Sequence, residues 1–272
     1  MSQERRTAII TGSASGLGRA LAVRLARDGW RLALADVAEE SNFKTLELVE
    51  RAGGSGQCER LDISRFEDWL ALRDRLQNQW TQLDLLVNNA GIAGSGEVGV
   101  FPIDEWRRLI DVNLMGAVYG CHVFVDWLKS HPQRSHIINT ASLAAFTAAP
   151  TMAAYNAAKA GVVALSETLS AELKQHRVGV TVLCPGFFAT NLLASGHFVN
   201  ETEKTFAEQM MEQSAFNADY VAEMAIRAMD RGQLHVVVGG RARWLWRIKR
   251  WFPRVYMKLL ASRYARGLSD AA

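Results

Sequence analysis

Short, mostly apolar segments alternate along the chain with longer segments that carry apolar residues at helical spacing. The short segments, expected to be buried strands, lie at about 7–10, 30–35, 57–61, 83–87, 136–140, 178–183 and 234–238. The expected helices lie at about 17–26, 39–52, 65–80, 104–130, 153–175 and 218–231. This alternation predicts a single α/β domain, with a doubly wound parallel sheet that helices cover on both faces. Ligands of such sheets bind at the carboxyl ends of the strands.

The first strand-to-helix junction carries a glycine-rich turn, Thr11-Gly12-Ser13-Ala14-Ser15-Gly16-Leu17-Gly18. Glycine lets the backbone turn sharply and approach a ligand closely, and the free N–H groups at a helix start attract a diphosphate. The turn therefore suggests a phosphate site. An ordinary turn between a strand and a helix has the same pattern, so the turn alone does not decide the question.

A carboxylate, Asp36, ends the second expected strand, about 20 residues beyond the glycines. In a dinucleotide-binding fold, an acidic residue at this place binds the adenosine ribose hydroxyls, and it would repel a 2′-phosphate. Neither Ser15 nor Val37 offers a neighbouring cation that could bind such a phosphate. We therefore expect NAD in preference to NADP. The alternative role of Asp36 is to end the strand or cap the next helix.

Length and composition fit this picture, since 272 residues suffice for one large α/β domain. The three cysteines, Cys58, Cys121 and Cys184, are widely separated, and free thiols in a reducing compartment are expected. The six histidines show no metal-ligand spacing, so no metal is expected. The polar N-terminus leads straight into the first strand, which argues against a signal peptide. No apolar run approaches the ~18–20 residues of a membrane span. A cytoplasmic location is expected.

Two further residues suggest acid–base chemistry. Tyr155 and Lys159 are four residues apart in one expected helix, so they share a face. A nearby ammonium favours the phenolate and would lower the tyrosine pKa from its ordinary value of about 10 toward neutrality. Taken alone, such a pair is also typical of an exposed helix face.

Two polar residues could assist this pair. Ser142, after the strand expected at 136–140, could hydrogen-bond a substrate carbonyl or alkoxide. Asn113, inside the helix expected at 104–130, could order a water that carries the proton out. Each also has a structural explanation, as a loop or cap serine and as a polar position in a helix.

Taken together, these motifs resemble the classical short-chain dehydrogenase/reductase family over about residues 5–240. The order and spacing of all its motifs agree with the family pattern. They are Thr11–Gly18, Asp62, Asn88-Asn89-Ala90-Gly91, Asn113, Ser142, Tyr155-Asn156-Ala157-Ala158-Lys159, Pro185-Gly186 and Thr190.

The resemblance implies a single Rossmann-type domain over 1–240 and a role for each motif. Asn113, Ser142, Tyr155 and Lys159 would form a catalytic tetrad, with Tyr155 as acid/base. The implied cofactor-binding residues are Gly12, Ser15, Gly16, Leu17, Gly18, Asp36, Asp62, Asn89, Gly91, Tyr155, Lys159, Pro185, Gly186 and Thr190. The expected reaction is reversible hydride transfer between a nicotinamide cofactor and a secondary alcohol or ketone.

The substrate side is expected to be apolar, because hydrophobic residues crowd the segments near the site. A lid is expected at about 187–216, and the residues expected to contact substrate are Ser142, Met152, Tyr155, Phe187 and Phe188. A lipophilic substrate explains this pattern, and simple packing of the lid onto the body explains it equally well.

The tail, 241–272, is a basic amphipathic extension. Nine of the 31 Lys and Arg residues lie in it against one of the 28 Asp and Glu residues, so it carries +8 and the remaining chain −5. Trp244, Ile248, Trp251, Val255 and Leu259 recur at helical spacing, and the helix is expected to break at Pro253. Contact with a membrane surface through 241–266 and packing on the body or on another subunit both remain open. Nucleic-acid binding is not expected.

Three hypotheses of function remain. The first is an NAD-dependent dehydrogenase, and its variant is an NADPH-dependent ketone reductase. The third is a non-catalytic dinucleotide-binding scaffold at a membrane, which would have no use for Tyr155 beside Lys159. The helices expected at 104–130 and 153–175 suggest a homodimer or homotetramer, mainly on the ground of the family resemblance.

Overall fold

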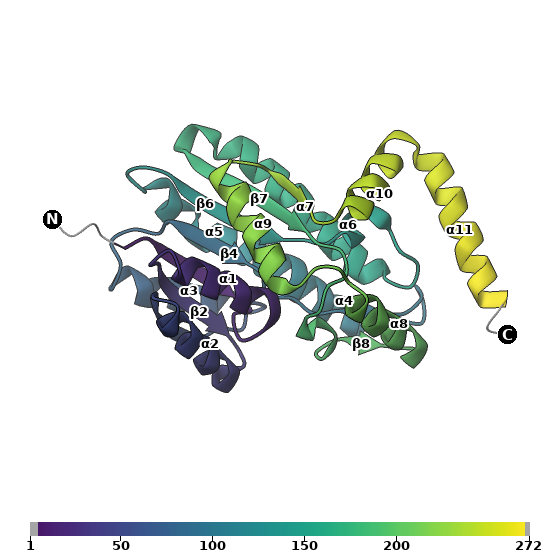
Figure 1. Cartoon of the computed structure of the whole chain (residues 1–272), viewed down its shortest axis with the longest axis horizontal. Coiled ribbons are helices and arrows are strands. Elements are labelled where there is room, and N and C mark those ends of the chain that lie inside the picture. Colours follow the sequence, from purple (N-terminus) through teal and green to yellow (C-terminus); the bar gives the residue numbers. More distant parts are fainter. Residues whose placement is uncertain (1–4, 270–272) are drawn as a thin grey trace.

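The computed structural model describes residues 5–269, and a central sheet of seven parallel strands organises it (Figure 1). The strand order is β3-β2-β1-β4-β6-β7-β9. The strands are β1 (Thr7–Thr11), β2 (Arg31–Asp36), β3 (Ser55–Arg60), β4 (Leu85–Asn88), β6 (Ser135–Thr140), β7 (Val178–Cys184) and β9 (His235–Val237). The winding direction reverses between β1 and β4, where α/β sheets form their ligand crevice. The α/β fold expected from the alternating pattern is confirmed.

Helices cover both faces of this sheet. The helices are α1 (Gly16–Ala26), α2 (Glu39–Arg51), α3 (Phe66–Gln77), α4 (Ile103–Ile110), α5 (Gly116–Lys129), α6 (Ala144–Thr147), α7 (Ala153–Glu172), α8 (Glu201–Glu212), α9 (Ala218–Asp230), α10 (Gly240–Trp251) and α11 (Pro253–Ser269). Buried residues of α1, α2 and α9 share one core cluster, and those of α3, α5 and α7 share another.

The two cores are separated by the alternation of side chains along each strand. In β1, Ala8 and Ile10 belong to the core under α1 and α9, whereas Ile9 belongs to the core under α3 and α5. Successive side chains of a strand point to opposite faces, and a parallel sheet that is buried on both faces needs apolar residues at both sets of positions. This explains why the strands appear in the sequence as continuous apolar runs.

The start of α3 differs from the expectation. The spacing of Ser64 and Glu67 predicts a capping box with Ser64 as N-cap. In the structure α3 begins at Phe66, and the Ser64 hydroxyl instead donates a hydrogen bond of 2.7 Å to Oδ1 of Asp62. The capping prediction is wrong, because the preceding carboxylate competes for the serine hydroxyl.

The helix expected at 104–130 is interrupted by a π-helical turn at Asp111–Met115, between α4 and α5. By length and composition alone, the whole run Ile103–Lys129 could cross a membrane. Within the fold, 44% of its most apolar window is buried, and Phe124 and Leu128 pack in the core under the sheet. Its apolar character is therefore that of a core helix.

The segment 187–216 is built from regular elements rather than being irregular. It contains a 3₁₀ turn at Asn191–Leu193, strand β8 (His197–Phe198) and helix α8. Strand β8 pairs in parallel with β5 (Gly94–Ser95), which ties this segment to the loop after β4. Helix α8 starts where Oδ1 of Asn200 accepts a hydrogen bond of 2.9 Å from the Thr202 amide.

The tail forms two helices, of which α10 rises from the body and α11 turns back down beside it (Figure 1). Helix α10 ends at Trp251 and α11 begins at Pro253, as the position of the proline predicts. The Trp246 ring of α10 packs on Phe146 and His235 of the body. Trp244, Trp251, Val255 and Leu259, expected to share one apolar stripe, are all exposed.

Candidate active site

A cleft of about 1630 Å³ runs along the carboxyl ends of the strands. Its walls come from the glycine turn, the ends of β2, β4, β6 and β7, the start of α7, the segment 187–216 and helix α11. Of the residues proposed from the sequence, those that line it are Gly12, Ser15, Gly16, Leu17, Asp36, Asp62, Asn89, Gly91, Ser142, Met152, Tyr155, Lys159, Pro185, Gly186, Phe187, Phe188 and Thr190. Gly18 and Asn113 lie behind this lining rather than in it.

The glycine turn shapes the end of the cleft beside β1 and β2. Gly12 and Gly16 have φ of +67° and +52°, a conformation that L side chains rarely adopt. A Cβ atom at Gly18 would overlap the carbonyl oxygen of Gly12, so the helix start and the turn touch through their backbones. Ser15, at the N-cap of α1, makes no side-chain capping bond, so the first amides of the helix, at Gly16 and Leu17 in the cleft lining, have no side-chain partner.

Asp36 holds the same turn from the side. Its carboxylate accepts hydrogen bonds from the amides of Ala14 (3.0 Å) and Ala38 (2.9 Å). These bonds orient the carboxylate beside the glycine turn, where it lines the cleft. Asp62 is oriented similarly by the amide of Ser64, at 3.0 Å.

The loop after β4 lines the centre of the cleft and is bonded to the end of β1. The Thr11 hydroxyl accepts hydrogen bonds from the amides of Asn89 (2.9 Å) and Ala90 (3.0 Å). Nδ2 of Asn89 donates to the carbonyl oxygen of Thr11 at 2.9 Å. These bonds lock the ends of β1 and β4 together, so the two sides of the crevice keep one geometry.

Tyr155 and Lys159 lie one turn apart on α7 and are almost fully buried, at 6% and 3% exposure. The Lys159 ammonium donates to the carbonyl oxygen of Thr140 at 3.0 Å, at the end of β6. It lies 5.8 Å from the centre of the Tyr155 ring. Ser142 completes the group, because its side chain hydrogen-bonds Tyr155. Strand β6 and helix α7 thus bring the three residues together.

Burial controls the ionisation of this pair. It raises the pKa of Tyr155 to about 12, and the Ser142 hydrogen bond opposes this rise only in part. Burial also lowers the pKa of Lys159 to about 8. The expectation that Lys159 brings the pKa of Tyr155 toward neutrality is therefore wrong for the chain alone. Loss of hydration disfavours the phenolate more than the Ser142 hydrogen bond favours it.

The side chain of Asn113 is hydrogen-bonded to the loop after β4. Its Nδ2 donates to the carbonyl oxygen of Ile92 at 2.8 Å, and its Oδ1 accepts from the Ile92 amide at 2.9 Å. These bonds satisfy both polar atoms of the buried amide side chain. The π-helical turn at 111–115 places it there, and Gly91 has no room for a Cβ beside it. The role expected for Asn113, ordering a water that carries the proton out, stays a prediction.

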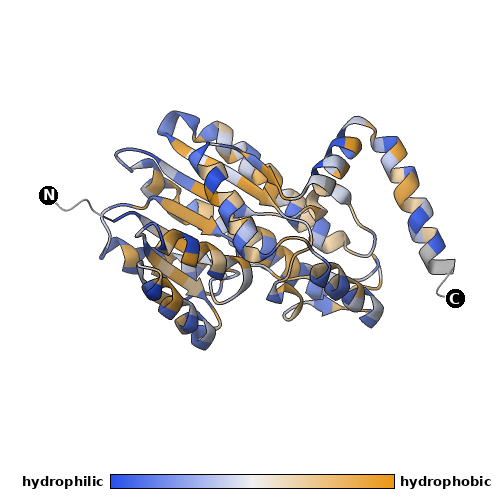
Figure 2. Cartoon of the chain, in the orientation of Figure 1, coloured by the Kyte–Doolittle hydropathy of each residue, from blue (hydrophilic) through white to orange (hydrophobic). Residues whose placement is uncertain are grey.

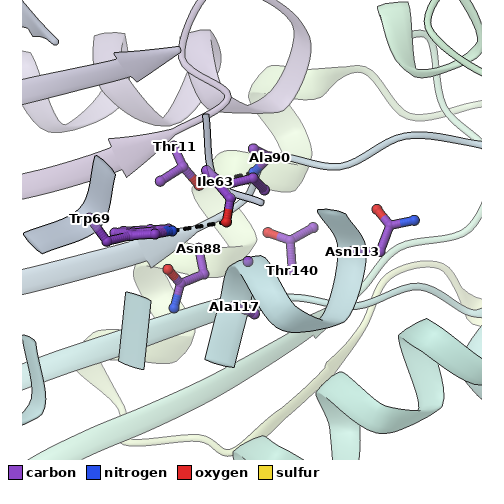
Figure 3. A pocket seen from close by; sticks show the side chains of 9 residues that line it. Thr11, Ile63, Trp69, Asn88, Ala90, Asn113, Ala117 and Thr140 are labelled. Atoms are coloured by element: carbon purple, nitrogen blue, oxygen red, sulfur yellow. Dashed lines mark hydrogen bonds between the residues drawn. The ribbon is translucent and has the colours of Figure 1, made fainter. Parts of the chain in front are cut away.

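A small polar cavity of about 10 Å³ lies behind the centre of the cleft (Figure 3). Thr11, Asn88, Asn113 and Thr140 line it from β1, β4, the π-helical turn and β6. Its volume is about that of one water molecule. Within residues 5–269, Oδ1 of Asn88 has no hydrogen-bond partner among the protein atoms. The space behind the site is therefore polar.

The far end of the cleft is apolar. Met152 and Phe187 line it, whereas Phe188 also packs into the core under α1 and α9. Phe188 thus belongs to the core as much as to the cleft. Further apolar lining residues are Val100, Leu143, Leu192, Leu193, Phe198, Val199, Phe206, Met211 and Leu260.

Sequence reasoning missed a polar group at this end. The Ser95 hydroxyl donates to Oε2 of Glu203 at 2.5 Å and lies 3.0 Å from the Thr151 hydroxyl. Thr151 has φ of +62°, which is strained for a β-branched residue. The three residues come from distant segments, so no local pattern in the sequence indicates the group.

Sequence reasoning also missed the contribution of α11. Leu260, Arg263 and Tyr264 line the cleft. The tyrosine hydroxyls of this helix bond the body, Tyr256 to the carbonyl oxygen of Thr147 at 2.9 Å and Tyr264 to Glu97. The spacing of Tyr256, Leu260 and Tyr264 at i, i+4 and i+8 could have indicated this second face.

Among the residues that the structure describes, no three His, Cys, Asp or Glu side chains gather into a group that could hold a metal ion.

The chain is similar to known oxidoreductases over most of its length. The profile of the family described as short chain dehydrogenase matches residues 6–201. The candidate oxidoreductase SadH of Mycobacterium tuberculosis is 33% identical over 267 residues, which cover 97% of this chain and 96% of that protein. The 3beta-hydroxysteroid dehydrogenase 1 of Eggerthella lenta is 31% identical over 229 residues, covering 83% and 87%.

A solved structure has the same fold. It is a short chain dehydrogenase/reductase from Burkholderia phymatum in complex with NAD, with a TM-score of 0.86 and 27% identity. The match covers 94% of this chain and 96% of that one. Sequence and fold therefore agree on one family.

Proposed function

The chain belongs to the short-chain dehydrogenases, an oxidoreductase family, and on that premise we propose that it transfers a hydride between NAD and a lipophilic secondary alcohol or its ketone. The observation that carries the proposal is the meeting of Tyr155, Lys159 and Ser142 in the cleft that begins at the glycine turn. A nucleotide-binding scaffold would have no need for this group.

The glycine turn fits a dinucleotide by its shape, since Gly12 and Gly18 pack closely and the start of α1 has no side-chain cap. Asp36 would hold the ribose and Asp62 the adenine edge. The remaining cofactor-binding residues in this proposal are Ser15, Gly16, Leu17, Asn89, Gly91, Tyr155, Lys159, Pro185, Gly186 and Thr190. When bound, the nicotinamide supplies or accepts the hydride.

The protein moves the proton in this reaction. In ketone reduction Tyr155 donates its proton to the carbonyl oxygen, and in alcohol oxidation its phenolate accepts the hydroxyl proton of the substrate. The Ser142 hydroxyl positions that oxygen. The Lys159 ammonium stabilises the phenolate that forms when Tyr155 gives up its proton. Asn113 holds the loop at Ile92 in place and so acts as a positioning residue.

The ketone-reduction rate is expected to depend on the protonation of Lys159. Tyr155, with its pKa raised to about 12, stays protonated at neutral pH, so the acid is present. Lys159 loses its proton near pH 8, and above that pH the phenolate is no longer stabilised. We expect kcat/KM for a ketone to be level between about pH 6 and 8 and then to fall. In Lys159→Met the rate should be low and show no such break; a break that persists contradicts the role given to Lys159.

The preference for NAD is expected to depend on Asp36. In Asp36→Ala, kcat/KM with NADP should rise relative to that with NAD by about tenfold to a hundredfold, because a like charge near the 2′-phosphate is removed. Rates with the two cofactors measure this ratio. Asp62→Ala is the matched control and should affect both cofactors alike. A wild-type protein that prefers NADP would identify the enzyme as an NADPH-dependent ketone reductase instead.

The apolar end of the cleft supports a lipophilic substrate, and a relative named as a hydroxysteroid dehydrogenase suggests polycyclic alcohols. A substrate screen that follows NADH absorbance should find long-chain or polycyclic alcohols turned over faster than small polar ones. Faster turnover of small polar alcohols would contradict this part of the proposal. For the assembly, a cytoplasmic homodimer or homotetramer is proposed, and light scattering after size exclusion measures its mass.

A further inference from the structure

Helix α11 forms a wall of the cleft with one of its faces. Tyr256, Leu260 and Tyr264 lie at i, i+4 and i+8, so they share one side of the helix. The two tyrosine hydroxyls bond the body at Thr147 and Glu97, and Leu260 and Tyr264 line the cleft. The inner face of α11 is therefore attached to the cleft at two lining residues, Thr147 and Glu97.

One flank of the same helix pair is apolar and exposed. Trp251 ends α10, and Val255 and Leu259 lie four residues apart on α11, with 76%, 54% and 58% of their surface exposed. Trp244, Phe252 and Met257 are exposed as well. Figure 2 shows apolar and polar residues interleaved along α11, away from the body. Such a concentration of exposed large apolar side chains on one helix pair marks a contact surface.

A basic stripe runs beside this apolar flank. Arg254 and Lys258, on α11, each precede an apolar residue of that flank by one position, which is about 100° around a helix, and Arg250 likewise precedes Trp251 on α10. Arg243 and Arg247 are exposed on α10 too. Within the described residues none of these five side chains forms an ion pair. The segment 241–266 contains no Asp or Glu. The surface therefore fits an anionic partner.

The rim of the cleft next to α11 is also apolar and exposed. Val100, Val199 and Phe206 line the cleft and are at the same time exposed, by 58%, 43% and 58%. Tyr264 bonds Glu97, in the loop that carries Val100, so the rim and α11 are neighbours. Apolar surface thus continues from the tail helices to the mouth of the cleft.

We propose that α10 and α11 bind the surface of an anionic lipid bilayer, and that a substrate dissolved in the bilayer reaches the cleft past the inner face of α11. Exposed tryptophans beside cations are the composition of helices that lie in a membrane interface. Nucleic acid would match the cations and leave the exposed Trp251 and Leu259 without a role. The second half of this proposal rests on the proposed oxidoreductase function.

Vesicle binding tests the first half. The probe is vesicles of phosphatidylcholine with phosphatidylserine, and bound protein is measured by co-sedimentation. Wild-type protein should bind, and less so as salt increases. The triple variant Arg250→Glu, Arg254→Glu, Lys258→Glu should bind about tenfold more weakly or worse, because each cation near an anionic surface contributes.

The matched control changes the same net charge elsewhere. Arg27, Lys174 and Arg231 are exposed, form no ion pair in the described chain and lie outside the tail. Arg27→Glu, Lys174→Glu, Arg231→Glu should bind vesicles within about twofold of wild type. If both triple variants lost vesicle binding equally, the net charge of the protein rather than the tail would explain the binding, and the proposal would be overturned. A wild-type protein that does not bind the vesicles would overturn the proposal too. So would a triple variant that binds the vesicles like wild type but has a different oligomeric mass in solution, because α11 would then contact a second copy of the chain.

Enzyme rates test the second half. In the same vesicles, a membrane-dissolved lipophilic alcohol should be oxidised about tenfold more slowly by the triple tail variant than by wild type. A short water-soluble secondary alcohol should give equal rates with the two proteins, because none of the three changed residues lines the cleft. Equal rates on the membrane-dissolved alcohol would overturn access past α11. Vesicle binding without turnover of any alcohol would refute the proposed function and leave the docking surface intact.

Discussion

Replacing Tyr155 by phenylalanine is expected to lower kcat by about 10³-fold, within the range that general acid–base groups contribute. The hydroxyl is the group that exchanges the proton with the substrate oxygen, and Tyr155→Phe removes it alone. The ring stays in its buried place, with Ile92, Phe101 and Ala154 in the same apolar cluster. NAD affinity should therefore stay within about threefold of wild type.

Two measurements check this result, steady-state turnover and a titration of NADH binding by fluorescence. Tyr119→Phe is the matched control, because its ring packs on Phe66 at 5.2 Å and lies outside the cleft. It should keep wild-type activity. If Tyr155→Phe retained most of the activity, the acid/base would be another group. If neither wild type nor variant were active while both bound NAD, the chain would be a nucleotide-binding scaffold.

The second large effect is expected from Gly18→Ala. The new methyl group would overlap the carbonyl oxygen of Gly12, and neither atom belongs to a flexible side chain. Relief requires α1 to move away from the turn, which opens the nucleotide end of the cleft. Overpacking of this kind costs about 3 kcal/mol, or about 6–12 °C in Tm for a domain of this size.

Thermal unfolding with and without NAD measures both consequences. The Tm of Gly18→Ala should fall, and the rise in Tm that NAD gives to the wild type should be largely lost. Gly240→Ala is the control, since a Cβ there meets no atom within 4 Å. A Gly18→Ala protein with unchanged Tm and unchanged stabilisation by NAD would contradict the close contact of turn and helix.

Much of the site could be predicted because its residues sit at the ends of regular elements. Asp36 ends a strand and Asn89 and Ser142 follow one, and the carboxyl ends of parallel strands meet at one edge of the sheet. Tyr155 and Lys159 share a helix face by spacing alone. Local periodicity and chain order therefore suffice to bring these side chains to one cleft.

The effect of the surroundings on the pKa and the hydrogen bonds of a side chain could not be predicted in this way. The pKa of Tyr155 rises because its hydroxyl is buried, and burial depends on every element that packs around α7. The side chain of Asn113 bonds the Ile92 backbone because Asn113 lies in a π-helical turn that directs it there. Neither packing nor an interruption of helical hydrogen bonding has a local signature in the sequence.

The sequence by itself determined the α/β fold, the cleft at the strand ends and the Tyr155–Lys159 pair, because each follows from a period or a spacing along the chain. Only the tertiary structure decided that the tail returns to the body and that Leu260 and Tyr264 wall the cleft. It also decided that Ser95, Thr151 and Glu203 meet. These contacts join residues separated by more than 50 positions, and contacts over such distances are set by the packing of whole elements rather than by any local pattern.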